Sequence, residues 1–77
     1  MKNIINYGTL KGLMEYMNKE HYKMMGIGLS EEEEQTIFYS LNDTFIVSIK
    51  YQILETDENN MIESINIIEV NSKLKGL

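Results

Sequence analysis

Hydrophobic residues in the first third of the chain repeat with the period of an α-helix. Between Leu10 and Met24 they recur at spacings of three and four residues, which places them on one stripe of a helix. Thr9 is suited to cap the start of this helix, and Gly26 is suited to the left-handed residue that ends one. The sequence therefore predicts an amphipathic N-terminal helix over residues 10–25. Its apolar stripe comprises Leu10, Leu13, Met14, Met17, His21 and Met24.

Three later stretches have the pattern of β-strands. Each is rich in Ile, Phe, Tyr, Val and Thr, and each is bounded by turn residues. They cover residues 35–41, 44–56 and 61–71, with Asn42 and Asp43 as the first turn and residues 57–60 as the second. We therefore expect an α+β fold in which the helix packs on a three-stranded antiparallel β meander. The chain is expected to form a single small domain, residues 1–77, with residues 72–77 as a loose tail.

Residues 31–41 allow a second interpretation. Ser30 followed by Glu33 fits a capping box, and Ile37, Phe38 and Leu41 would line one side of a short helix. We favour the strand, because a two-residue turn leads directly from this segment into an alternating strand.

Charge is distributed unevenly along the chain. The net charge is -5, from 12 acidic residues and 7 lysines, and residues 26–71 contain one lysine and all the acidic residues except Glu15 and Glu20. The expected meander places Leu41 opposite Thr44 and Glu34 near Tyr51, so the run of glutamates at 31–34 reaches the end of the sheet where the second turn lies. We call the resulting group the acidic pole. It comprises Glu31, Glu32, Glu33, Glu34, Glu55, Asp57, Glu58 and Glu63.

The acidic pole has three possible uses. It keeps a small protein in solution, it docks on a basic surface of another protein, or it binds a divalent cation. The cation use is the weakest, because the segment from Asp57 to Asn59 begins like a calcium loop but Met61 occupies a ligand position and the required glycine is missing. No metal site is therefore predicted. Direct binding to DNA or RNA is disfavoured by the negative charge and the absence of arginine.

The sequence offers little for catalysis. It has one histidine and no cysteine, so the usual acid–base and nucleophilic pairs are missing, as are cysteine-based zinc sites and disulfides. We interpret His21 as a partly buried residue of the core or of an interface. Gly26 and Gly28 follow a predicted helix rather than a strand, so they do not form a dinucleotide loop. We expect a protein that is not an enzyme, with no catalytic residues and no cofactor.

Composition suggests an origin and a compartment. Half of the chain consists of Phe, Tyr, Met, Ile, Asn and Lys, whose codons are rich in A and T, whereas alanine and arginine are absent. This bias favours a low-GC bacterium or a virus that infects one. Apolar runs are too short to cross a membrane, and the first residues have no signal-peptide pattern. We therefore expect the cytoplasm of a bacterial host and no membrane partner.

Several apolar and aromatic residues are candidates for contact with other molecules. Tyr16, Tyr22 and Met25 fall off the helix stripe and are candidate partner-binding residues. The third strand carries too many isoleucines for one face, and the second face of the sheet would also carry Phe38, Ile46 and Leu54. A homodimer is therefore expected. Its candidate self-association residues are Ile65, Ile67 and Ile68.

These observations lead to two functional hypotheses. In size, acidity and composition the chain is similar to the small inhibitors that phages and other mobile elements make against host defence or replication proteins, a similarity of type rather than of motif. The first hypothesis is a non-enzymatic protein whose acidic pole blocks the basic groove of a host nucleic-acid-handling or defence protein by mimicking nucleic acid. The alternative is a self-assembling structural or housekeeping protein of a low-GC bacterium.

Overall fold

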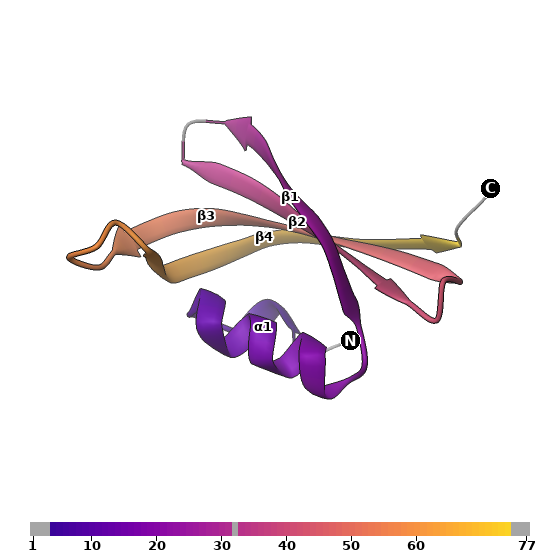
Figure 1. Ribbon diagram of the computed structural model, residues 1–77. Coiled ribbons are helices and arrows are strands. Elements are labelled where there is room, and N and C mark those ends of the chain that lie inside the picture. Colours follow the sequence, from indigo (N-terminus) through magenta and orange to yellow (C-terminus); the bar gives the residue numbers. More distant parts are fainter. Residues whose placement is uncertain (1–3, 32, 75–77) are drawn as a thin grey trace.

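The chain folds as a short 3-10 helix, one α-helix and four β-strands. The computed structural model describes residues 4–31 and 33–74, apart from the side chains of residues 29–31. The elements are η1 (Ile4–Asn6), α1 (Leu10–Lys19), β1 (Lys23–Glu31), β2 (Glu34–Leu41), β3 (Phe45–Thr56) and β4 (Ile62–Leu74). The strands form one twisted antiparallel sheet in the order β1-β2-β3-β4, and α1 lies along one face of it (Figure 1). The expected α+β class is confirmed, but the expected number of strands is wrong.

The helix ends earlier than the hydrophobic pattern predicts. α1 stops at Lys19, after which His21 N donates to Asn18 O at 3.0 Å and Tyr22 N donates to Met17 O at 2.9 Å. His21 has a φ of 68°, the left-handed conformation that closes a Schellman motif. His21 is also exposed, so its predicted place as a partly buried residue on the helix stripe is wrong.

The residues after this helix end form the first strand instead of two further helical turns. β1 pairs antiparallel with β2, from Lys23 opposite Ser40 to Glu31 opposite Glu34. Met24, predicted on the apolar stripe of the helix, lies on this strand and is 46% exposed. Gly26, predicted to end the helix, lies inside the strand.

The first turn has one more residue than predicted. Leu41 pairs with Phe45, and Thr44 belongs to the turn, where its N–H donates to Leu41 O at 2.9 Å. Asn42 and Asp43 both have a positive φ, of 52° and 56°, as a type I′ turn requires. The β2–β3 register is therefore displaced by one residue from the expected one. Residues 34–41 are a strand, so the alternative of a short helix over 31–41 is wrong.

The hydrophobic core lies between α1 and one face of the sheet. Leu13 and Met17 are the buried residues of α1, and buried side chains from β2, β3 and β4 meet them. Within the core, the Tyr51 hydroxyl donates to Gln35 Oε1 at 2.8 Å, which gives a half-buried polar atom a partner. The buried apolar residues are Ile4, Leu13, Met17, Ile37, Tyr39, Val47, Ile49, Tyr51, Ile65 and Ile67.

The segment before the helix is attached to the last strand. Ile65 N donates to Gly8 O at 2.9 Å, and Thr9 forms an isolated antiparallel bridge with Ser64. Thr9 also accepts a hydrogen bond from Gly12 N at 3.1 Å, so the predicted cap of the helix is confirmed. These contacts fix where α1 begins relative to β4. β4 itself extends to Leu74, so residues 72–74 are not a loose tail, and residues 75–77 lie outside the described part of the chain.

Candidate partner-binding surfaces

The β1–β2 turn brings part of the glutamate run against β3. Ile53 N donates to Glu33 O at 2.7 Å, and Glu34 pairs with Gln52 rather than with the expected Tyr51. The Glu34 carboxylate also forms an ion pair with Lys50, at 3.3 Å between Oε1 and Nζ. Glu33 is exposed. Of the other two glutamates in the run, Glu31 is placed by its backbone alone, opposite Glu34, and Glu32 lies outside the described residues.

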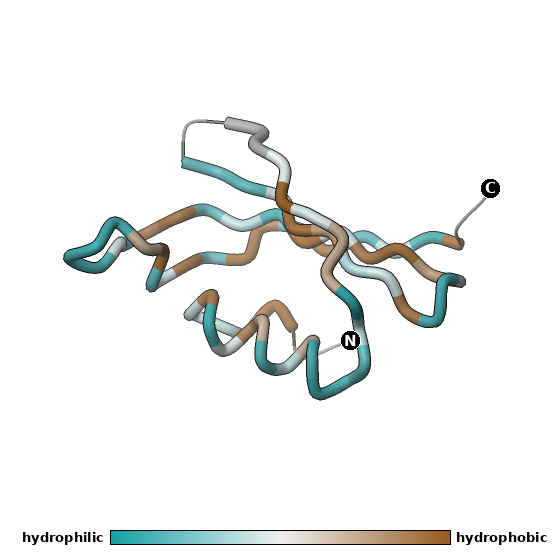
Figure 2. The backbone as a smooth tube through the Cα atoms, in the orientation of Figure 1, coloured by the Kyte–Doolittle hydropathy of each residue, from teal (hydrophilic) through white to brown (hydrophobic). Residues whose placement is uncertain are grey.

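The acidic residues of the second turn lie on the same half of β3, but two of them have intramolecular partners. Glu55 Oε1 accepts from the Ser64 hydroxyl at 3.1 Å. Asp57 Oδ1 accepts from the backbone N–H groups of Asn59 and Met61, at 2.8 and 2.9 Å, so this carboxylate organises the turn. Figure 2 shows the hydrophilic character of this turn, which contrasts with the hydrophobic centres of the strands. Glu58 and Glu63 are exposed.

The two candidate tyrosines pack against other tyrosines. The Tyr16 ring lies 5.4 Å from that of Tyr7, and the Tyr22 ring meets Tyr39 edge-on at 6.5 Å between centroids. Both are half-buried and lie against the core, so each offers only part of its surface to a partner. Desolvation raises the pKa of the Tyr16 hydroxyl, and the neighbouring Glu20 carboxylate adds to the effect. Tyr16 is therefore a neutral hydrogen-bonding group at neutral pH.

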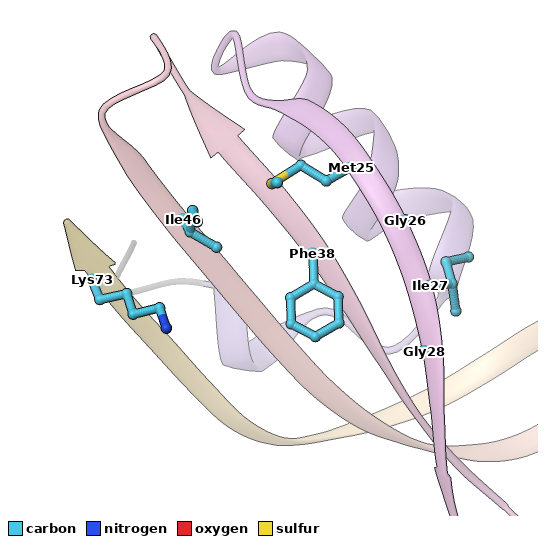
Figure 3. Close-up of a pocket in the computed structure, with 7 residues that line it drawn as sticks. All are labelled: Met25, Gly26, Ile27, Gly28, Phe38, Ile46 and Lys73. Atoms are coloured by element: carbon cyan, nitrogen blue, oxygen red, sulfur yellow. The ribbon is translucent and has the colours of Figure 1, made fainter. Parts of the chain in front are cut away.

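An apolar pocket lies on the face of the sheet opposite α1. Phe38 falls between the buried Ile37 and Tyr39 of β2, so its side chain points away from the core. Figure 3 shows Phe38 together with Met25, Ile46 and Lys73 on this face, where the lining residues border a shallow, open pocket of about 440 Å³. Gly28 lies against the Phe38 ring, since a Cβ built on Gly28 would be in van der Waals contact with it at 3.5 Å. We call this the open-face pocket; its lining comprises Met25, Gly26, Ile27, Gly28, Phe38, Ile46 and Lys73.

The three candidate self-association residues separate into two groups. Ile65 and Ile67 are 2% and 5% exposed and belong to the core under α1, so their side chains are not at the surface. Ile68 is 44% exposed and lies where the β3–β4 register shifts, as the extra residue of a bulge. Ile68 is thus the one member of this group that another molecule can contact.

β1 is the surface element that sequence reasoning missed. The overlooked signal is the alternation of large apolar residues with glycine from Met25 to Leu29, which has the period of a strand. It was hidden because Met24 also fits the helix spacing. Met25, predicted as a contact residue on the helix but off its apolar stripe, is 52% exposed on this strand instead.

No group of three histidine, cysteine, aspartate or glutamate residues among the described residues is arranged to hold a metal ion. Among the same residues, α1 included, we find no helix with the length and apolar character needed to span a bilayer.

Comparison with protein families, with curated proteins and with solved structures gave no match. The function is therefore argued from the surfaces of this chain.

Proposed function

We propose that this chain is a non-enzymatic binding protein that docks through its acidic pole on the basic surface of a host protein that handles nucleic acid. The observation that carries the proposal is the hydrogen bond from Ile53 N to Glu33 O, which holds the β1–β2 turn on the half of β3 that leads to Glu55 and the second turn. Glu33, from the glutamate run, thereby lies beside the half of β3 that carries Glu55, and this supports the proposal.

The exposed members of the pole are the ones suited to contact a partner. Glu33, Glu58 and Glu63 are exposed, whereas Glu34, Glu55 and Asp57 are held in ion pairs or hydrogen bonds within the chain. Like charges held close together repel one another in the free protein, and a lysine- or arginine-rich groove relieves that repulsion. Carboxylates placed in this way stand in for the phosphates that such a groove binds. The result would be inhibition of the host protein by competition with nucleic acid.

The test compares two triple variants with the same change in net charge. Glu33→Gln/Glu58→Gln/Glu63→Gln removes exposed charge from the pole, and Glu15→Gln/Glu20→Gln/Glu69→Gln removes exposed charge from α1, its C-terminal end and β4. Each tagged protein captures partners from the lysate of a low-GC bacterium, and mass spectrometry identifies them. We expect DNA- or RNA-binding proteins with wild type and the control variant, about tenfold less capture with the pole variant at low salt, and displacement by added duplex DNA. Equal capture by both variants would contradict the proposal.

A self-assembling structural or housekeeping protein is the second candidate. The observation in its favour is the exposure of large apolar side chains on the sheet, among them Met25, Phe38 and Ile68. Because Ile65 and Ile67 are buried, a lysine at either position would unfold the chain rather than report on assembly. Self-assembly would therefore have to use exposed apolar residues such as Met25, Phe38 and Ile68 rather than Ile65 and Ile67.

A further inference from the structure

β1 is an edge strand of the sheet formed by the described residues. In the described part of the chain, its hydrogen-bonded neighbour is β2, on one side, whereas the opposite edge strand β4 is bridged by Gly8 and Thr9 at Ser64 and Ile65. The free side of an edge strand carries unpaired N–H and C=O groups that pair readily with another strand. Proline and inward-pointing charge commonly prevent this pairing, but β1 has no proline and no charged residue between Lys23 and Glu31.

Large apolar side chains flank this free edge. Met24, Met25 and Ile27 are 46%, 52% and 48% exposed. Figure 3 shows Met25 extending toward Phe38 over the open-face pocket, with Ile27 on the other side of the β1 ribbon. Apolar surface therefore borders the edge on both faces of the sheet, and a strand added here would cover part of each.

The sequence of β1 is close to symmetric about Ile27. Gly26 and Gly28 are equidistant from it, and so are the apolar residues Met25 and Leu29. The oppositely charged Lys23 and Glu31 are equidistant as well. In antiparallel pairing of two copies about a two-fold axis, each position meets the position at the same distance on the other side of the axis, so a strand with this pattern is complementary to a second copy of itself. Gly26 meets Gly28, Met25 meets Leu29, Lys23 meets Glu31, and Met24 meets Ser30.

Charges near the ends of β1 complement each other in the same arrangement. The exposed Lys23 is the first residue of β1, the exposed Lys19 is the last residue of α1 just before it, and the exposed Glu33 lies in the turn that follows the end of β1. Antiparallel pairing brings the basic start of one strand beside the acidic end of the other, twice per dimer. This local attraction opposes the general repulsion between two copies that each carry a net charge of -5.

We propose that the chain forms a two-fold dimer in which β1 pairs antiparallel with β1 of a second copy, with Ile27 opposite its own counterpart. The two sheets become one eight-stranded antiparallel sheet. The register shifts against β2 fall at Met25 and Ser30, so residues 26–28, which are symmetric about Ile27, are regular in both copies and form the centre of the new ladder. The interface rests on β1 and is independent of the acidic pole's proposed partner.

A single cysteine at the axis tests the pairing directly, because the chain has no cysteine of its own. Directly opposed residues of antiparallel strands have Cα atoms about 4.5–5.5 Å apart, within the span of about 4.4–6.8 Å that a disulfide bridges. We expect Ile27→Cys to form a covalent dimer under mild oxidation, and the matched Met61→Cys, in the second turn and 64% exposed, to remain a single chain. Wild type should sediment with twice the mass of one chain.

Charge reversal provides a second test that leaves the apolar surface intact. Lys23→Glu should weaken the dimer about tenfold at low salt, since like charges would then face each other twice. The exchange Lys23→Glu/Glu31→Lys should restore it. A wild-type mass of one chain at all concentrations would overturn the proposal. So would equal crosslinking at Met61→Cys, a dimer that Ile27→Cys does not link, or a charge exchange that restores nothing.

Discussion

His21 is the residue at which the backbone leaves the helix. Its φ of 68° places a side chain with a Cβ in the left-handed region, next to the two hydrogen bonds that close α1. Residues other than glycine occupy this region at a cost, although histidine tolerates it better than alanine does. The side chain is exposed, so it contributes little packing in return. Local strain is thus concentrated at one position between helix and sheet.

Substitution at this position should reveal the strain. We expect His21→Gly to raise the free energy of unfolding by about 1 kcal/mol, because glycine has no Cβ to oppose the left-handed conformation. His21→Ala is the matched control and should lower it or leave it within about 0.5 kcal/mol of wild type. Urea denaturation followed by circular dichroism measures both. If glycine destabilised the protein as much as alanine, the conformation assigned to His21 would be incorrect.

At the scale of elements, the turns determine where strands pair. The β3–β4 turn is organised by Asp57, whose Oδ1 accepts from two backbone N–H groups, and the first turn is closed by the hydrogen bond from Thr44 N to Leu41 O. One additional residue in a turn moves every cross-strand partner by one position. This is how Glu34 comes to face Gln52 and to reach Lys50.

Substitutions at Asp57 can distinguish its role as a hydrogen-bond acceptor in the turn from the effect of its negative charge. Asp57→Ala should lower the free energy of unfolding by about 1–2 kcal/mol, because it leaves the N–H groups of Asn59 and Met61 without their acceptor. Asp57→Asn keeps an oxygen in that place and should recover most of the loss. Glu58→Ala, next to it and exposed, serves as control and should change stability by less than about 0.5 kcal/mol. Thermal unfolding of the three variants measures these differences. Equal losses of stability in Asp57→Ala and Asp57→Asn would show that the negative charge of Asp57, and not its place as a hydrogen-bond acceptor, stabilises the turn.

Much of the element pattern could be predicted from the sequence, and the errors have physical causes. The three strands after residue 34 follow from their alternation and turn residues, and the start of the helix follows from Thr9. The helix end was misplaced because Met24 fits the helical spacing by coincidence, while the helix is in fact stopped by a histidine where glycine is usual. Of the acidic pole, the sequence could show which carboxylates to consider. It could not show that the Lys50 ion pair and the turn hydrogen bonds engage some of them.

At the scale of the whole molecule, the buried core lies on one face of the sheet, the face that α1 covers. The core under α1 holds two tyrosines, Tyr39 and Tyr51, whose pKa values are raised by burial, with the neighbouring Tyr39 adding to the effect on Tyr51. In the unfolded chain, tyrosine ionises from about pH 10. The unfolded chain therefore loses these protons at a lower pH than the folded chain does, and alkali favours unfolding.

The resulting expectation is a loss of stability at high pH. The free energy of unfolding should be unaffected by these groups below about pH 9 and should fall as pH rises beyond about pH 10. Tyr39→Phe/Tyr51→Phe should flatten that fall, even though loss of the bond to Gln35 makes the variant less stable at neutral pH. Denaturant titrations between about pH 8 and about pH 11 measure the slope. An equally steep fall in the double variant would show that these tyrosines are not responsible.

The bond between Gly8 O and Ile65 N also constrains how the fold is reached during synthesis. It joins a residue near the beginning of the chain to one near the start of the last strand, so almost all the described chain must have left the ribosome before it can form. Hairpins β1–β2 and β2–β3 involve neighbours in sequence and close early. Leu13 and Met17 belong to the same core as Ile65 and Ile67 of β4, so part of their apolar surface stays uncovered until β4 joins the sheet. The interval before residues 62–74 have left the ribosome is therefore the one in which this protein is most exposed to aggregation and to chaperones.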